Sequence, residues 1–363
     1  MSTPRATRPA TPPATPRAAT AIAAALLLAA CTTPAPTATR PAQTPRQHHP
    51  APPTTVVIER TPWTFAGNRG NTIRTPHYRI FTTASNTVLL DRVPAFLEQT
   101  IEHYRTAALE DPSIPLPLPA RSLDTYFMDS RPQWEAITTR ILGERRNAAL
   151  NIQRGGFATR GIGVYYDIGL ADTLAVAAHE GWHQYTQRTF RHRLPTTLEE
   201  GLATYMEGHT WHDGRARFKP WANLARYDQL RNAAAQERLL SLEELTASSP
   251  SHLAAFGDDR LLTYYAQAWA LTHYLKLHHP RALDAILRDA AEGRLNRRTN
   301  HALRELPPER RPTNHAAAVL AAYAAIPEGI TTAQLEQRLS SFTAQLIATG
   351  SRDRIAQGQR PVP

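Results

Sequence analysis

The sequence predicts an α+β fold in which a β-rich part precedes a helical part. Segments rich in β-branched and aromatic residues fall before about Leu170, and long segments with apolar residues three or four positions apart dominate after it. Strands followed by helices, rather than strands alternating with helices, are typical of α+β domains. We therefore expect a mostly antiparallel sheet with one helix over residues 55–170, and a mainly helical part over residues 171–363.

In the β-rich part, the pattern predicts strands at residues 54–58, 77–82, 123–127 and 163–166. Apolar residues at helical spacing predict a helix over residues 88–108. Because Pro94 suits only the first turn of a helix, we expect this helix to start after Val88. In the second part, the same reasoning predicts helices at residues 172–190, 198–208, 223–236, 259–278 and 280–292, and at least two more after His315.

The first thirty residues have the composition of a signal peptide. Three arginines and no acidic residue precede a run of small and apolar residues that is too short to span a bilayer. The run ends in Leu28-Ala29-Ala30-Cys31, which resembles a bacterial lipobox. This resemblance implies cleavage before Cys31 and an N-terminal lipid anchor in the cell envelope, in the outer membrane or on the periplasmic face if the cell is Gram-negative. The alternative is a plain signal peptide in which Cys31 has no such role.

Residues 31–54 are dominated by proline, threonine and alanine and are expected to form a solvated tether. Cys31 is the only cysteine, so the chain forms no internal disulfide. The formal charge of +10 comes from scattered arginines without a basic stripe and interleaved aromatics. The sequence therefore gives no sign of a nucleic-acid partner. It also leaves the oligomeric state open.

A metal-binding pattern lies in the first helix of the second part. His179-Glu180-Gly181-Trp182-His183 is an HExxH motif, and residues four apart on a helix project from the same face. Zinc accepts neutral imidazole nitrogens and needs at least one further protein ligand. Glu180, beside the first histidine, is placed to act as general base on a metal-activated water. We expect Asp172 to cap this helix.

A second acidic motif follows. Leu198-Glu199-Glu200-Gly201-Leu202-Ala203 begins the next predicted helix, and Glu200 lies seventeen residues after His183. A helix–loop–helix of this length can return an acidic side chain to the first helix. Either Glu199 with Thr196, or Glu200 with Thr197, could instead form a capping box.

Together the two motifs resemble those of the gluzincin peptidases, in which HExxH is followed on the next helix by a glutamate before Gly-x-Ala. The resemblance implies one zinc ion bound by His179, His183 and Glu200, with Glu199 left for the capping role. It is closer to peptidase MA-like bacterial lipoproteins of a domain-of-unknown-function family, which show His-Glu-Gly-x-His-Gln and a later Tyr-Ala-Gln-x-Trp-Ala-Leu. Residues 179–184 and 265–271 match these motifs, and the resemblance extends from about Tyr78 to about Gly293. The metzincin pattern is absent, because Thr186 and Thr189 stand where it requires glycine and histidine.

The resemblance also implies two supporting groups. Gluzincins often stabilise the oxyanion with a tyrosine or histidine from a later helix, which here points to Tyr265, although Tyr265 could equally be a packing residue. They also hold substrate on an edge strand before the metal helix, here Gly163, Val164 and Tyr165, although an ordinary sheet strand is also compatible.

The expected activity is zinc-dependent hydrolysis of a peptide or protein, with residues 55–363 as one catalytic unit. One alternative is a non-catalytic zinc-binding envelope protein that serves as a binding module. Another is a hydrolase of an unusual amide, such as a peptidoglycan cross-bridge.

Overall fold

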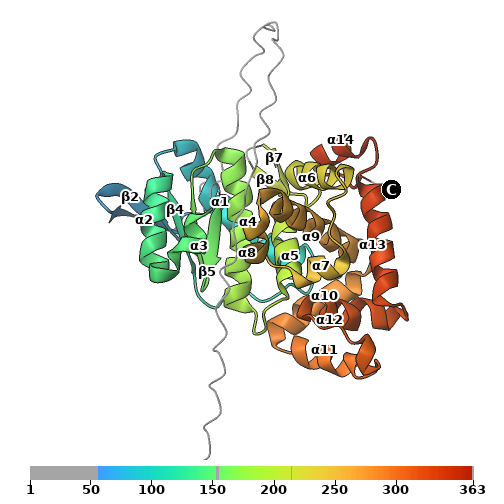
Figure 1. Cartoon of the computed structure of the whole chain (residues 1–363). Helices are drawn as coiled ribbons and strands as arrows, with labels where there is room; N and C mark the ends of the chain where they lie inside the picture. The colour runs from blue at the N-terminus through green and yellow to red at the C-terminus, as the bar shows by residue number, and fades with distance from the viewer. Residues whose placement is uncertain (1–55, 153–154, 214, 362–363) are drawn as a thin grey trace, which may run out of the picture.

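The computed structural model describes residues 56–152, 155–213 and 215–361. The predicted signal peptide, the lipidation site at Cys31 and the whole tether lie outside the described residues. Figure 1 places the sheet and its helices on one side, the C-terminal helices on the other, and α4 between them.

The β-rich part forms a six-stranded mixed sheet, which confirms the α+β class. Its strands are β1 (Glu59–Phe65), β2 (Asn68–Arg74), β3 (Tyr78–Thr82), β4 (Leu123–Met128), β5 (Gly156–Thr159) and β6 (Ile162–Tyr166). The order is β1-β2-β3-β4-β6-β5. The β3–β4 and β4–β6 pairs are parallel and the other three are antiparallel.

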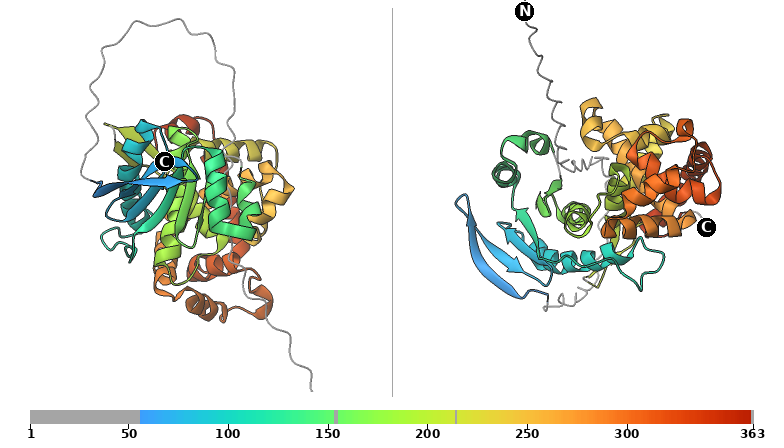
Figure 2. Two further views of the ribbon diagram at one scale, coloured as in Figure 1. Left: turned by 90° about the vertical axis from the view of Figure 1, so that its left-hand side faces the viewer. Right: turned by 90° about the horizontal axis from the view of Figure 1, so that it is seen from below.

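Helices cover both faces of the sheet (Figure 2). On one face, α1 (Thr87–Thr106) and α4 (Leu170–Thr189) share the main hydrophobic core with Tyr165 of β6. On the other face, α2 (Arg131–Leu142), with the short η1 (Gly143–Arg145) and α3 (Arg146–Leu150) after it, closes a smaller core that contains Val164 and Tyr166. Because successive side chains of a strand point to opposite faces, β6 contributes to both cores.

Three local predictions are wrong. The part before residue 170 contains α2 and α3 in addition to the one helix that we expected. The first strand starts at Glu59 rather than near residue 54, and its Pro62 is tolerated because β1 is an edge strand of the sheet. Helix α1 starts at Thr87, ahead of Pro94, with Asn86 as its cap. Leu89 and Val93 before the proline are buried in the core, and this burial compensates for the hydrogen bond that Pro94 cannot donate.

The second part is mainly helical, as predicted, with one hairpin that the pattern did not reveal. The hairpin consists of β7 (His209–His212) and β8 (Arg215–Phe218). The helices after α4 are α5 (Thr196–Met206), α6 (Leu224–Ala235), α7 (Leu242–Ala247), α8 (Pro250–Leu253), α9 (Asp258–His278), α10 (Pro280–Glu292), α11 (Leu295–Leu303), α12 (His315–Leu320), α13 (Thr332–Leu346) and α14 (Ser351–Ala356). Short η2 (Ala254–Phe256), η3 (Pro308–Arg310), η4 (Ala321–Ala325, a π-helix) and η5 (Ile326–Glu328) connect them.

Within the described residues, no single helix combines the length and the apolarity that a membrane span requires. Two consecutive segments, His315–Glu328 and Thr332–Leu346, pass such a test only together, and they are bent by 92° against each other.

Candidate metal centre

Helix α4 carries the first two candidate ligands on one buried face. It begins after Gly169, whose φ of +99° favours glycine, so Asp172 lies in the first turn and is not the cap that we expected. His179 and His183 are almost completely buried, with exposed fractions of 0% and 1%. They lie one helical turn apart, and their Nε2 atoms are 3.2 Å from each other.

Helix α5 brings Glu200 to the same point. Its Oε2 atom lies 3.4 Å from Nε2 of His179 and 3.3 Å from Nε2 of His183. Ligand atoms held at about 2.0–2.1 Å from a tetrahedral zinc ion lie about 3.3 Å apart. The three donor atoms therefore form a triangle of the size that such an ion requires, and they are the one group of this kind among the described residues.

Each imidazole is oriented by a second carboxylate. The Nδ1 atom of His179 lies 2.8 Å from Glu207, and that of His183 lies 3.0 Å from Glu199. A carboxylate at Nδ1 keeps the proton on that nitrogen, so the lone pair of Nε2 points toward the common centre.

The carboxylate of Glu207 is itself held by two further residues. Arg226 donates to both of its oxygens, at 3.2 and 2.9 Å, and Asn223 donates to Oε2 at 2.7 Å. Glu207 lies outside both sequence motifs. One feature of the sequence could have indicated its role: Glu207 follows Glu200 by seven residues, which places both on the same helical face, two turns apart.

The predicted cap role of Glu199 is wrong. Helix α5 has Pro195 at its N-cap position and no capping side chain. Glu199 instead turns toward α4, where its Oε1 atom accepts a hydrogen bond from Thr186 at 2.6 Å in addition to its contact with His183. Glu199 therefore orients a ligand, and Glu200 provides the oxygen at the centre.

Glu180 is buried but unpartnered. Its exposed fraction is 1%, and no described residue donates a hydrogen bond to either carboxylate oxygen. Burial raises its pKa to about 7, despite the opposing effect of the neighbouring histidines. A carboxylate with such a pKa can accept and return a proton near neutral pH.

The electrostatics of the cluster favour a cation. Burial opposes the charged form of Glu200, but the two histidines lower its pKa to about 2. Burial also opposes protonation of His179, but Glu200 and Glu207 raise its pKa overall. The two imidazoles are thus in contact with three carboxylates, those of Glu199, Glu200 and Glu207. Arg226 is the one permanently positive side chain in this network. The donor set, its size and its charge all fit a divalent metal ion.

The glycines of both motifs permit close packing. A Cβ atom at Gly181 would lie 2.4 Å from the hydroxyl of Tyr104, which donates to the carbonyl of Ala178 on the metal helix. A Cβ atom at Gly201 would lie 2.5 Å from the carbonyl oxygen of Ala268 on α9. Glycine at position 201 therefore lets α5 approach α9, which supports the helix that carries Glu200.

Gln184, the last residue of the extended motif, ties α4 to the sheet. Its amide donates to the carbonyls of Asp124 and Gly161, and it accepts from Thr125. These bonds hold the metal helix against β4 and the turn before β6.

Tyr265 lies beside the centre. Its ring centroid is 6.0 Å from that of His179, and the guanidinium of Arg226 lies 5.1 Å from its ring. Burial, followed by the charge of Glu200, raises its pKa well above the ordinary value, so it stays protonated and can donate a hydrogen bond. Its role in an oxyanion site remains a prediction.

The predicted edge strand is wrong. β6, with Gly163, Val164 and Tyr165, lies between β4 and β5 and pairs with both. Its main-chain groups are engaged in the sheet, and all three residues are buried. The strand at this edge of the sheet is β5.

Three other histidines of the second part, His192, His209 and His212, do not belong to this group of candidate ligands. His209 donates from Nδ1 to the carbonyl of Glu207 and packs against Phe96, and His212 pairs with Asp213 at the surface. His192 accepts from the backbone of Asn296 and lines the cavity described next.

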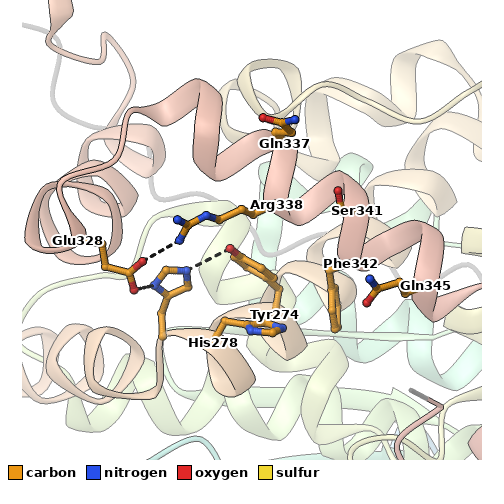
Figure 3. Close-up of a pocket in the computed structure, with 9 residues that line it drawn as sticks. Tyr274, His278, Glu328, Gln337, Arg338, Ser341, Phe342 and Gln345 are labelled. Carbon is orange, nitrogen blue, oxygen red and sulfur yellow. Dashed lines mark hydrogen bonds and ion pairs between the residues drawn. The ribbon is translucent and has the colours of Figure 1, made fainter. Parts of the chain in front are cut away.

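The centre adjoins a cavity of about 350 Å³, to which His183, Glu199 and Glu200 contribute. A separate cavity of about 540 Å³ lies between the end of α9 and α13 (Figure 3). There His279 contacts Glu328 at 2.7 Å and Tyr274 at 3.2 Å, and Arg338 donates to Glu328. The polar groups of this second cavity form hydrogen bonds and ion pairs with one another. At the metal centre, in contrast, the carboxylate of Glu180 has no hydrogen-bond partner among the described residues.

The second part of the chain resembles a known family. Residues 173–294 match the family model described as "Protein of unknown function (DUF1570)", a stretch that contains α5, α9 and nearly all of the metal helix. The expected resemblance from about Tyr78 is thus found only from Thr173 onward. No curated protein and no solved structure matches the chain.

Proposed function

We propose that this protein is a zinc-dependent peptidase of the gluzincin type. The observation that carries the proposal is the triangle of donor atoms from His179, His183 and Glu200, beside the buried, unpartnered carboxylate of Glu180. Structural zinc sites use four protein ligands, whereas catalytic sites use three and leave a position for water. The described residues offer three.

Zinc held by these three residues would acidify a water molecule and polarise the carbonyl of a bound amide. Glu180 accepts the proton of the attacking water, for which a pKa near 7 is suited, and then donates it to the leaving amine. Tyr265 donates a hydrogen bond to the developing oxyanion. Glu199 and Glu207 keep the two imidazoles in the ligating tautomer.

The lipid anchor at Cys31 and a location in the bacterial envelope belong to the same proposal. They rest on the lipobox-like sequence alone.

Metal analysis combined with one substitution tests the activity. The purified protein should contain one zinc per chain and cleave peptides, and chelation should abolish cleavage. Glu180→Gln should retain zinc and lose turnover by several orders of magnitude. Peptidoglycan fragments in the same screen test the unusual-amide alternative. If Glu180→Gln cleaves as fast as the parent, the assigned base is wrong; if the zinc-loaded parent cleaves no substrate, the protein is a binding module.

A further inference from the structure

The cavity beside the metal centre is enclosed by four segments. They are the end of β5 with the turn after it, the C-terminal half of α4 with the loop that follows it, the start of α5, and residues 249–251 at the start of α8. Its volume of about 350 Å³ lies within the range of small ligand sites. Because His183 and Glu200 contribute to its wall, a ligand in this cavity lies against the metal centre.

Three positively charged side chains contribute to the wall of the cavity. Arg160, Arg191 and Arg193 line it, and all three are exposed. Among the described residues, no carboxylate forms an ion pair with any of them. The acidic residues that line the same cavity are Glu199 and Glu200, and both are engaged with the imidazole of His183.

Two of these arginines are held on a fixed loop. The backbone of Arg191 donates to the carbonyl of Ala291, and that of His192 donates to the carbonyl of Ala290, at the end of α10. The loop is thus anchored at its main chain, while the guanidinium groups of Arg191 and Arg193 remain available for a ligand.

Such a wall selects for negative charge. Several like charges on one concave surface raise the local concentration of oppositely charged ligands. A guanidinium group also matches the two oxygens of a carboxylate in a bidentate pair. We propose that the protein selects peptides that carry carboxylates next to the scissile bond, because the cavity lined by the three arginines, called here the basic cleft, attracts them. This inference rests on the proposed function.

The test uses internally quenched peptides that differ only in charge. One peptide carries glutamate at the positions flanking its centre, and its partner carries glutamine there. With the zinc-loaded full chain, kcat/KM for the glutamate peptide should exceed that for the glutamine peptide by at least about tenfold at 50 mM salt. The ratio should fall toward one at 1 M salt, where charges are screened beyond about 3 Å. A second pair, with a free or amidated C-terminus, separates a side-chain carboxylate from a terminal one.

Substitutions assign the effect to the cleft. The triple variant Arg160→Gln, Arg191→Gln and Arg193→Gln should lose the preference but keep its zinc and its cleavage of the glutamine peptide. Arg60→Gln is the matched control, because Arg60 is exposed on β1, at the opposite edge of the sheet from β5. This control should keep the preference.

Binding to the Glu180→Gln protein separates this inference from the proposed activity. Fluorescence anisotropy should show tighter binding of the labelled glutamate peptide, and the added arginine substitutions should remove the difference. Equal binding and equal cleavage of both peptides would overturn the acidic preference and leave the peptidase standing. Selective binding without any cleavage by the parent would support the cleft and overturn the peptidase.

Discussion

Replacement of Glu180 by glutamine should stabilise the metal-free protein at alkaline pH, although it removes the proposed base. The carboxylate is buried without a described hydrogen-bond donor, and burial raises its pKa from 4.5 to about 7. A charged group without partners in such a place destabilises the folded state. Glutamine has nearly the same shape and carries no charge.

The pH dependence follows from the direction of this shift. Between pH 4.5 and about 7, the folded state binds more protons at this position than the unfolded state, so stability decreases as the pH rises through this window. At about 1.4 kcal/mol for each pKa unit, the full effect is about 3 kcal/mol above pH 7. The variant should therefore exceed the parent by less than about 1 kcal/mol at pH 5 and by about 3 kcal/mol at pH 8.

Urea unfolding in the presence of a chelator at pH 5 and pH 8 measures this difference. For a folded part of about 300 residues, the same effect raises the Tm at pH 8 by about 5 °C. Glu144→Gln, at an exposed position of η1, is the control and should change stability little at either pH. A Glu180→Gln protein no more stable than the parent at pH 8 would show that Glu180 is solvated or paired.

Three further changes test the packing and the charges around the centre. Glu207→Gln should weaken zinc binding by about 10- to 100-fold in competition with a chromophoric chelator, because His179 loses its charged partner; unchanged affinity would contradict the orienting role. Gly201→Ala should lower the free energy of unfolding in urea by about 2–3 kcal/mol, because the added methyl group meets the carbonyl of Ala268; unchanged stability would mean that α5 can move away from α9. Asp289→Asn should lower stability by about 2 kcal/mol at pH 7, because Asp289 accepts from Arg294, Arg298 and Tyr323. Burial opposes the charged form of Asp289, but these donors lower its pKa overall in the folded state. The difference in stability between the parent and the variant should therefore disappear as the pH falls below about 4. A variant that is still less stable than the parent at such a pH would contradict this assignment.

The sequence was sufficient for the parts of the centre that depend on local spacing. His179 and His183 share a helical face because residues four apart always do, and Glu200 was distinguished from Glu199 by the following Gly-x-Ala. The structure gives a physical reason for that glycine, since only Gly201 allows α5 to approach α9 so closely.

The parts that the sequence did not predict depend on contacts between distant segments. Arg226 lies in α6 and Asn223 is the N-cap residue of that helix, and they meet Glu207 across 19 and 16 positions, respectively. The order of the strands also depends on contacts between distant segments. β6 forms a hairpin with β5, but it pairs with β4 as well. The periodicity of residues 163–165 does not indicate that this strand has a partner on each side. The spacing of Thr196 and Glu199 fits a capping box, but Pro195 rather than Thr196 occupies the N-cap position. Glu199 can therefore face α4.

The loop between α4 and α5 links the metal centre to the proposed selectivity. Its length determines where Glu200 meets the two histidines, and two of its side chains, those of Arg191 and Arg193, line the cavity. Carboxylates contact the two histidines, and arginines line the adjoining cavity, so a cation and an anionic peptide are favoured at adjacent points. Because the backbone of the loop is anchored to α10, substitution of its arginines should alter the peptide preference without moving Glu200. An insertion in the loop, in contrast, should disturb both.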